Sequence, residues 1–332
     1  MKKESLLIIL PLFTLSLSSC SAYAVHHEMK EYILEMDYKK DMRILQLNDI
    51  HIGDKDNRAL HYDFLDLTIK DANADLIVLD GDIFTFASRH TAKELFSFID
   101  SYGIPWTATF GNHDEQCYFS VDWLTSYLND FGSNCLFKDI QDDDVFGNAN
   151  FAINLKRGSE VFETIVIMDS NRYYFGDYFG YDYIKPDQVE WYENLIHYIA
   201  DQYGGGSVIP SLAYFHIPLM EFSDAWDAYQ KGDPDAVYLL GEKREDVCSP
   251  KINTGLFDKM VELGSTNAIF CAHDHRNSYA ITYKGITLSY GLNSTDRVYF
   301  DPDLMGGQVI TLREDHSFAI EQIFHTYEEV AK

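Results

Sequence analysis

Five short polar segments in this chain each follow directly on an apolar run with the composition of a β-strand. The polar segments occupy residues 49–51, 80–82, 110–114, 214–218 and 273–275, and the apolar runs occupy residues 43–47, 76–79, 107–110, 211–215 and 268–271. Open α/β sheets bind their ligands beyond the carboxyl ends of the strands, where these segments would lie. The pattern therefore predicts an α/β domain whose functional site is assembled from residues that follow five strands.

The polar segments supply oxygen and imidazole donors, without a set of cysteine thiolates. Their candidate site residues are Asp49, His51, Asp82, Asn112, His113, Asp114, His216, His273 and His275. Such donors suit Mn, Fe or Zn better than a cysteine-rich structural zinc site. Residues i and i+2 of a strand share a face, so His273 and His275 can converge on one point. Each segment alone is common, because Asp-x-His and Gly-Asp also occur in surface turns.

Taken in order, these segments resemble the motifs of the calcineurin-like metallophosphoesterase superfamily. The matching pieces are Asp49-x-His51, Gly81-Asp82, Gly111-Asn112-His113-Asp114, His216 and His273-x-His275. Residues 168–170, 247–257 and 285–291 further resemble the Dcr2-type phosphatases and their relatives similar to plant purple acid phosphatase 29. The resemblance spans about 42–324 and implies a four-layer α-β-β-α sandwich of two mixed sheets flanked by helices. The strand and helix pattern alone predicts only one mixed α/β domain.

The resemblance also implies a role for each candidate residue around two divalent metal ions, Mn, Fe or Zn. Asp82 would bridge the ions. One ion would be completed by Asp49, His51 and His275, and the other by Asn112, His216 and His273. The expected nucleophile is a hydroxide between the ions, with His113 as the acid for the leaving oxygen and Asp114 orienting His113. The purple enzymes carry a Tyr three residues after the bridging Asp, whereas this chain has Thr85, which disfavours a tyrosinate-held ferric ion.

The sequence predicts an exported phosphoesterase, and other functions stay open. A phosphodiesterase acting on nucleotides or glycerophosphodiesters would use the same dinuclear centre. A surface protein that binds metal without catalysis is the more distant alternative. The expected partner is a small phosphorylated substrate; the oligomeric state is not indicated.

The N-terminus has the features of an export signal. Residues 1–20 combine a basic start with an apolar run too short for a comfortable membrane span, and they end in Leu17-Ser18-Ser19-Cys20, which resembles a bacterial lipobox. Lipidation of Cys20 would give a lipoprotein at the cell surface or in the periplasm. Cleavage after Ala22-Tyr23-Ala24 would instead give a secreted protein. Residues 21–41 are expected to be a linker and residues 42–326 the enzyme domain.

The formal net charge of −27 excludes nucleic-acid polymers and anionic membrane surfaces as electrostatic partners. The only expected membrane contact is therefore an N-terminal lipid anchor. A phosphate substrate is still compatible with this charge, because bound divalent ions invert the local field.

Helices are predicted over 91–102 with Thr91 as N-cap, from Ser120, from Pro186 and over 254–263. Strands are predicted over 150–156 and 163–169 as a hairpin, and over 279–283, 286–290, 308–312 and 318–324.

Three features allow two interpretations each. The Tyr-rich segment 173–183 is either an aromatic rim that stacks on a sugar or base, or a surface loop packed on itself, and the second is favoured. Arg172 beside it either contacts a phosphate or is an ordinary surface charge. Cys117 and Cys135 either form a disulfide or, with Cys248 and Cys271, stay thiols.

Overall fold

The computed structural model describes residues 27–331, and within them the chain forms two large mixed sheets. The first sheet has the order β15-β14-β2-β3-β4. Its strands are β2 (Met42–Leu47), β3 (Leu76–Asp80), β4 (Trp106–Thr109), β14 (Gly306–Leu312) and β15 (Phe318–Phe324). In this sheet β2, β3 and β4 run parallel, as expected for strands separated by helices.

The second sheet has eight strands in the order β1-β5-β6-β9-β11-β13-β12-β10. They are β1 (Ile33–Asp37), β5 (Phe151–Arg157), β6 (Glu160–Ile167), β9 (Ser211–Tyr214), β10 (Ala236–Leu240), β11 (Thr266–Cys271), β12 (Ala280–Tyr283) and β13 (Ile286–Tyr290). Strands β6, β9, β11 and β13 are mutually parallel, so their carboxyl ends share one edge. A separate short hairpin pairs β7 (Tyr173–Phe175) with β8 (Phe179–Tyr181).

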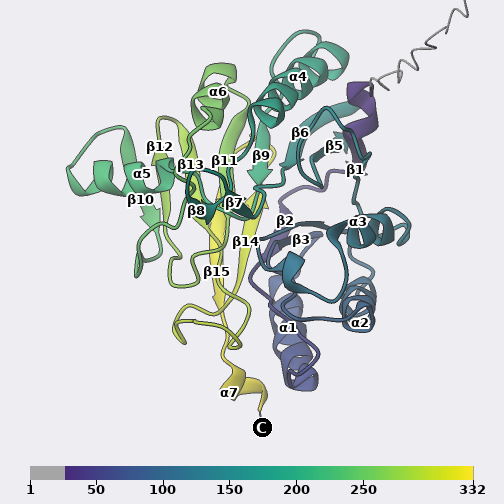
Figure 1. The fold of residues 1–332 in the computed structure, drawn as a ribbon. Helices are drawn as coiled ribbons and strands as arrows, with labels where there is room; N and C mark the ends of the chain where they lie inside the picture. The colour runs from purple at the N-terminus through teal and green to yellow at the C-terminus, as the bar shows by residue number, and fades with distance from the viewer. Residues whose placement is uncertain (1–26, 332) are drawn as a thin grey trace, which may run out of the picture.

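Helices cover the outer faces of both sheets (Figure 1). The helical segments of the described residues are η1 (Met29–Tyr32), α1 (Arg58–Ala72), α2 (Arg89–Asp100), η2 (Asp114–Gln116), α3 (Val121–Asn129), α4 (Pro186–Tyr203), α5 (Glu221–Gln230), α6 (Leu256–Leu263) and α7 (Tyr327–Val330), of which η2 follows β4 and does not cover a sheet. In the view of Figure 1, α4 and α6 lie at one end and α1 and α2 at the other, with the sheets between them. No helix within residues 27–331 combines the length and the apolar character needed to cross a bilayer.

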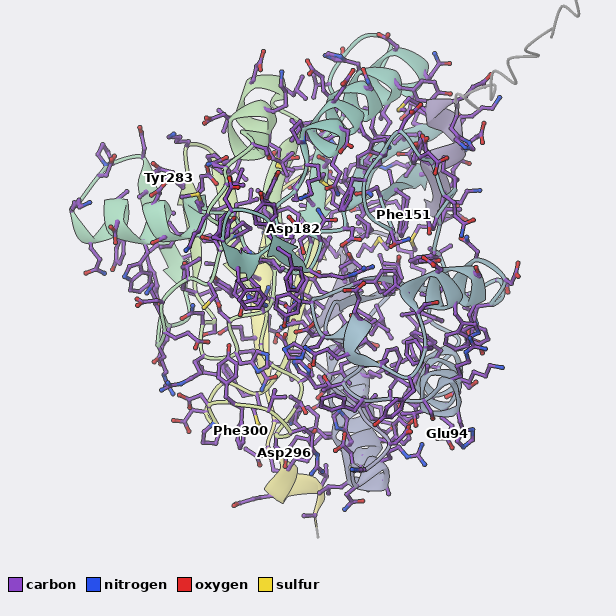
Figure 2. The ribbon with its side chains drawn as sticks, viewed as in Figure 1. Glu94, Phe151, Asp182, Tyr283, Asp296 and Phe300 are labelled. Atoms are coloured by element: carbon purple, nitrogen blue, oxygen red, sulfur yellow. The ribbon has the colours of Figure 1, made fainter. Side chains whose placement is uncertain are left out.

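Alternation along the strands separates two hydrophobic cores. On β11, Ala268 and Phe270 belong to the core between the sheets, whereas Ile269 and Cys271 belong to the core under the helices α4 and α6. This is the period of two of a strand that is buried on both faces. Side chains fill the space between the ribbons in Figure 2, where the labelled Phe151 lies in the core between the sheets. The predicted four-layer sandwich is confirmed.

Several local predictions are confirmed and one cap is wrong. Pro186 opens α4, and Ser120 caps α3 by accepting the N–H of Trp123. The hairpin of β5 and β6 also forms as expected. The cap of α2 is Ser88, not Thr91, because the Ser88 hydroxyl accepts the Thr91 N–H and α2 begins at Arg89.

Part of the expected linker 21–41 is structured. Residues 33–37 form β1, which pairs in parallel with β5 at the edge of the larger sheet, with Ile33 opposite Ala152. The alternation in this strand is too short to have predicted it. The predicted signal peptide, the lipobox and Cys20 lie outside the described residues.

The cysteines of the described region are thiols and form no disulfide. Cys271 is fully buried in the core under α4 and α6, where it acts as a small hydrophobic side chain. Of the two interpretations that the sequence allowed, the structure favours the thiols over a Cys117–Cys135 bridge.

Removal of a core side chain from α4 tests this packing. Leu195 lies on the buried face of α4 and is fully buried, so Leu195→Ala should lower the free energy of unfolding by about 2–5 kcal/mol. Asn194→Ala, at the exposed neighbouring position, should change it by less than about 0.5 kcal/mol. Equal effects of the two variants in urea denaturation would show that α4 does not pack on the sheet as described.

Candidate metal centre

The candidate residues come from the carboxyl ends of strands in both sheets. Asp49 and His51 follow β2, Asp82 follows β3 and Asn112 follows β4, while His216 follows β9 and both His273 and His275 follow β11. The site therefore lies where the edges of the two sheets meet, and each sheet supplies part of it.

Six of these side chains form two groups that share one carboxylate. Asp49, His51, Asp82 and His275 make the first group, and Asp82, His216 and His273 make the second. Within each group the ligand atoms lie within 4.8 Å of one another, and all these residues are buried. Asp82 is thus placed to contact two ions, as predicted.

The closest approaches join imidazole Nε2 atoms to the two carboxylates. His216 Nε2 lies 3.1 Å and His51 Nε2 lies 3.6 Å from Asp82 Oδ2. His275 Nε2 lies 3.3 Å from Asp49 Oδ1. The Nε2 atoms of His51 and His275 are themselves 3.3 Å apart, so several lone-pair donors face one small volume.

Four of the atoms at this volume have no hydrogen-bond partner among the described residues. They are Asp49 Oδ1, Asn112 Oδ1, His216 Nε2 and His273 Nε2. The 3.1 Å approach of His216 to Asp82 is an ion-pair distance without the alignment of a hydrogen bond. Buried polar atoms are normally satisfied, because leaving one unpaired costs roughly 1–3 kcal/mol. The donor set and its unsatisfied atoms fit divalent cations, and Asn112 joins the second group through its amide oxygen.

The opposite nitrogen of three rings is held by an oxygen of the protein. His216 Nδ1 lies 2.9 Å from the carbonyl oxygen of Asp80, and His275 Nδ1 lies 2.7 Å from that of Tyr299. A carbonyl only accepts, so Nδ1 carries the proton and Nε2 presents its lone pair to the centre. His51 Nδ1 is held by the hydroxyl of Thr85 at 2.7 Å. In the sequence Thr85 stands out as a departure from the purple enzymes, whereas no motif indicates that Tyr299 holds the ring of His275.

Burial and charge act against each other in the centre. Burial lowers the pKa of His51 and of His273 to about 3, so both rings are neutral ligands. Burial opposes the charged form of His216 as well, but the neighbouring carboxylate of Asp82 outweighs it and raises the pKa of His216 to about 10. The Nε2 lone pair of His216 is thus taken by a proton unless a cation takes the place of that proton. Burial would raise the pKa of Asp82, yet the adjacent imidazoles, His216 foremost, hold that pKa well below its usual range. The carboxylate is therefore ionised and requires positive charge beside it.

The backbone at four ligand positions is in the left-handed region. The φ angles are 53° at Asp49, 49° at His51, 47° at Asp82 and 75° at His273. This conformation costs roughly 1–2 kcal/mol for a residue with a Cβ, and such strain is concentrated at functional sites. The prediction that His273 and His275 share one face of a strand is wrong, because β11 ends at Cys271, before His273. His273 and His275 consequently point to different groups and not to one point.

Two glycines leave room for the ligands. A Cβ on Gly111 would lie 2.2 Å from Asp82 Oδ1, and a Cβ on Gly81, whose φ is +80°, would lie 2.5 Å from His216 Nδ1. The Gly-Asp and Gly-Asn-His-Asp spacing is therefore a steric requirement of the centre.

His113 lies beside the ligands without belonging to either group. Its N–H donates to Asp82 Oδ1 at 2.7 Å, and its ring lies 4.9 Å from that of His51. Its Nδ1 is 2.9 Å from Gln116 Oε1, a contact that sequence reasoning missed.

The prediction that Asp114 orients the ring of His113 is wrong. The Asp114 carboxylate accepts the backbone N–H groups of Phe84 and Gly111, each at 2.8 Å. It therefore ties together the loops after β3 and β4, and Gln116 is the residue that holds the ring. Burial is the main cause that raises the pKa of Asp114, to about 7.

The Tyr-rich segment packs on itself, as favoured from the sequence, with ring contacts such as Tyr174 on Tyr178 and Tyr173 on Phe179. It also contacts the centre. At the start of the β7–β8 hairpin, the Tyr173 hydroxyl accepts from Asn112 Nδ2 at 2.9 Å. At its end, the Tyr181 ring meets His273 edge-on, with 4.3 Å between centroids. The Tyr and Gly composition has no period that would have located this hairpin in advance.

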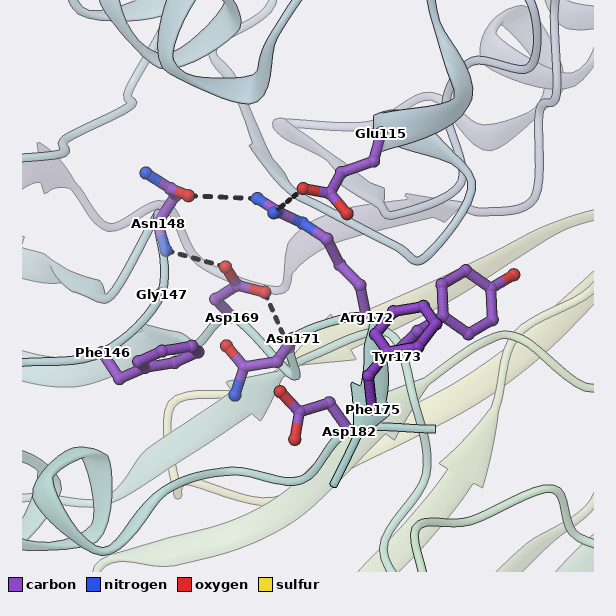
Figure 3. Close-up of a pocket in the computed structure, with 10 residues that line it drawn as sticks. All are labelled: Glu115, Phe146, Gly147, Asn148, Asp169, Asn171, Arg172, Tyr173, Phe175 and Asp182. Carbon is purple, nitrogen blue, oxygen red and sulfur yellow. Dashed lines mark hydrogen bonds and ion pairs between the residues drawn. The ribbon is translucent and has the colours of Figure 1, made fainter. Parts of the chain in front are cut away.

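Two cavities are lined by residues of the centre or by their neighbours. One of about 450 Å³ is shown in Figure 3, with Tyr173, Phe146 and Phe175 among its walls. In it Arg172 is paired with Glu115 and donates to Asn148 Oδ1 at 3.1 Å, so its charge is already engaged by the protein. The other, about 550 Å³, is lined by residues that include His51, Thr85, Phe86, Tyr118 and Arg297.

Comparisons with known proteins agree with this geometry. The family model described as calcineurin-like phosphoesterase matches residues 42–277. A protein of Arabidopsis thaliana named probable inactive purple acid phosphatase 14 is 29% identical over 315 residues, covering 84% of this chain and 76% of the relative. The phosphatase DCR2 of Saccharomyces cerevisiae is 30% identical over 200 residues, which cover 57% of this chain and 33% of DCR2.

Among solved structures, a dimetal phosphatase from Danio rerio has the same fold. It aligns with a TM-score of 0.55 at 13% identity, covering 83% of this chain and 94% of the other. Since the family model covers most of the chain and the paired ligand groups are present, this chain belongs to the calcineurin-like phosphoesterase family and is a metallophosphoesterase.

Proposed function

We propose that the protein hydrolyses phosphate esters at a centre of two divalent ions, Mn, Fe or Zn. The observation that carries the proposal is the pair of buried ligand groups that share Asp82 and contain donor atoms without protein partners. Two such ions, when bound, supply Lewis-acid activation of water and neutralise the charge of the phosphoryl group. Asp49, Asp82, Asn112 and the four ligand histidines hold them.

His113 donates the proton to the leaving oxygen in this proposal. Gln116 Oε1 accepts from Nδ1 of the protonated ring, which leaves the N–H at Nε2 available to the substrate. The backbone N–H of His113 is bonded to Asp82, so the ring is fixed next to the shared carboxylate. An imidazole suits this task because its ordinary pKa lies near neutrality.

Phosphodiesters are the second candidate class of substrate. The cavity of about 450 Å³ is lined by Tyr173, which contacts the ligand Asn112, and the cavity of about 550 Å³ is lined by the ligand His51. A diester places one organic substituent on each side of the phosphorus, and the two cavities offer room for both. Parallel assays on a generic phosphomonoester and a generic phosphodiester separate these two substrate classes.

A protein that binds metal without catalysis is the remaining alternative. Three Arabidopsis thaliana relatives are named as probable inactive phosphatases. In this chain the six charged or imidazole ligands converge, and His113 is in place beside Asp82. The complete set favours activity.

The proposal also includes where the protein is located. We infer from residues 1–20 that the protein is an exported lipoprotein at the cell surface or in the periplasm, with Cys20 as the lipidated residue. A secreted form cleaved after Ala24 is the alternative.

Asp82→Ala should remove both metal ions or nearly so, because Asp82 is the one carboxylate common to the two groups. Elemental analysis of the purified protein should give two divalent ions per chain for the wild type. Asp258→Ala, on the exposed face of α6, is the matched control and should keep both ions. Recovery of two tightly bound ions from Asp82→Ala would remove Asp82 from the centre of the site.

His113→Gln should keep both ions and lower turnover by roughly 10²–10⁴, the usual contribution of a general acid. The loss should be largest for alkyl phosphates, which need a proton on the leaving oxygen, and smaller for activated aryl phosphates. His197→Gln, exposed on α4, is the control. Loss of metal from His113→Gln would make His113 a ligand, and normal turnover of alkyl phosphates would refute its role as the acid.

Cys20→Ser should abolish lipid modification and release an active protein into the soluble fraction, because every proposed site residue lies far downstream. Mass spectrometry of the N-terminus and membrane fractionation test this. A wild-type protein found entirely in the soluble fraction with Val25 as its first residue would support ordinary signal cleavage instead.

A further inference from the structure

The Tyr173 hydroxyl lies at the metal centre with both of its lone pairs engaged. Asn112 Nδ2 donates to it at 2.9 Å, and Gln116 Nε2 donates to it at 3.4 Å. A tyrosine hydroxyl has one proton to donate in addition to its acceptor positions. Within residues 27–331 we find no acceptor for that proton. The hydroxyl is therefore a donor whose partner is not part of the protein.

The orientation of both amides follows from the residues around them. Asn112 Oδ1 is the buried oxygen without a protein partner in the ligand group, so the amide nitrogen is the end that faces Tyr173. Gln116 accepts the proton on Nδ1 of His113 through Oε1, so its nitrogen also faces Tyr173. This second step rests on the proposed function, in which Nδ1 of His113 carries the hydrogen that Gln116 Oε1 accepts.

The position of Tyr173 places its hydroxyl directly beside a ligand of the centre. The residue starts β7, is half-buried, and forms the wall between the ligand Asn112 and the cavity of about 450 Å³ in Figure 3. Its hydroxyl and the ring of His113 both contact the side chain of Gln116, and the backbone N–H of His113 donates to Asp82.

We propose that the Tyr173 hydroxyl donates a hydrogen bond to a non-bridging oxygen of the phosphoryl group of the substrate. A donor held in place by two protein amides needs no reorganisation when negative charge increases on that oxygen, which is the condition for stabilising a transition state. Tyr173 is then a catalytic residue of the reaction, distinct from the metal ligands and from the acid His113. The substrate class that it favours has a terminal phosphoryl group with a free, charged oxygen on the side of β7.

A purely positioning role is the alternative. Tyr173 could act only by holding the amide of Asn112, in which case its hydroxyl matters for metal binding and makes no contact with phosphate. The two roles differ in metal content, in phosphate affinity and in the response to added metal.

The test compares Tyr173→Phe with Tyr174→Phe, the next residue of the same hairpin, whose ring packs on Tyr178 on the other face. Metal content, kcat/KM for 4-nitrophenyl phosphate and inhibition by inorganic phosphate are measured for both variants and the wild type. We expect Tyr173→Phe to keep two ions, to lose about 10- to 100-fold in kcat/KM, and to bind inorganic phosphate more weakly. This range corresponds to one hydrogen bond to a charged group. Tyr174→Phe should match the wild type.

Two results would overturn the role of the Tyr173 hydroxyl, and a third would overturn the proposed function. Wild-type kcat/KM and phosphate inhibition in Tyr173→Phe would overturn the proposal. Loss of metal with a rate restored by excess Mn²⁺ would also overturn it and assign Tyr173 to positioning. If the wild type loaded with metal hydrolyses neither a monoester nor a diester, the proposed function fails, and weaker phosphate binding by Tyr173→Phe is still measurable.

Replacement of Tyr173 with 3-fluorotyrosine provides a second variant if Tyr173→Phe does not fold. Fluorination makes the phenol a stronger donor and a weaker acceptor. Tighter binding of inorganic phosphate at unchanged metal content would support the proposal, and unchanged or weaker phosphate binding would contradict it.

Discussion

Two carboxylates, Asp49 and Asp82, are buried at 1% exposure, and the cationic side chains of residues 27–331 within ion-pair distance of them are all imidazoles. Removing an anion from water without a compensating charge is among the most costly steps that a fold can take. Histidines offset that cost only by taking up protons, which a lone pair directed at a metal ion does not permit. The centre is therefore stable when cations supply the charge, and the surrounding structure serves to hold the ligands around them.

The ligands can be held only if the two sheets keep a fixed alignment. A buried polar network directly beneath the centre provides it. Gln46 on β2 donates to Asp80 Oδ2 at 2.6 Å, and Gln308 on β14 donates to Gln46 Oε1 at 3.0 Å and to Ser289 on β13 at 3.1 Å. Since Ser289 belongs to the larger sheet, these bonds cross the interface between the sheets. Apolar packing alone would allow the sheets to slide, whereas paired amides specify one register.

The sequence located the ligands well, because each lies directly after a run of buried apolar residues and the runs predict parallel strands. The family resemblance implied that Asp82 is shared between two groups, and the geometry has the same arrangement. Its errors have physical causes. Asp114 is adjacent to His113 along the chain, but the backbone N–H groups of Phe84 and Gly111 compete for its carboxylate.

Contacts between residues distant in the chain were beyond the reach of sequence patterns. Asn112 and Tyr173 are 61 residues apart, and the hairpin that brings them together has neither the length nor the alternation of a predictable strand. The polar helix α5 and the edge strands β1 and β10 were missed for a similar reason. Their exposed faces dilute the apolar pattern on which such predictions depend.

Thr85, whose hydroxyl lies 2.7 Å from Nδ1 of His51, also bears on the visible absorption and the redox behaviour expected of the centre. A phenolate at this position would give a ferric ion both a hard anionic ligand and a charge-transfer transition in the visible range. A threonine hydroxyl bonded to an imidazole gives neither. The candidate ligands are carboxylate, amide and imidazole groups, so the centre would lack this phenolate band even though several of its relatives are named for their purple colour.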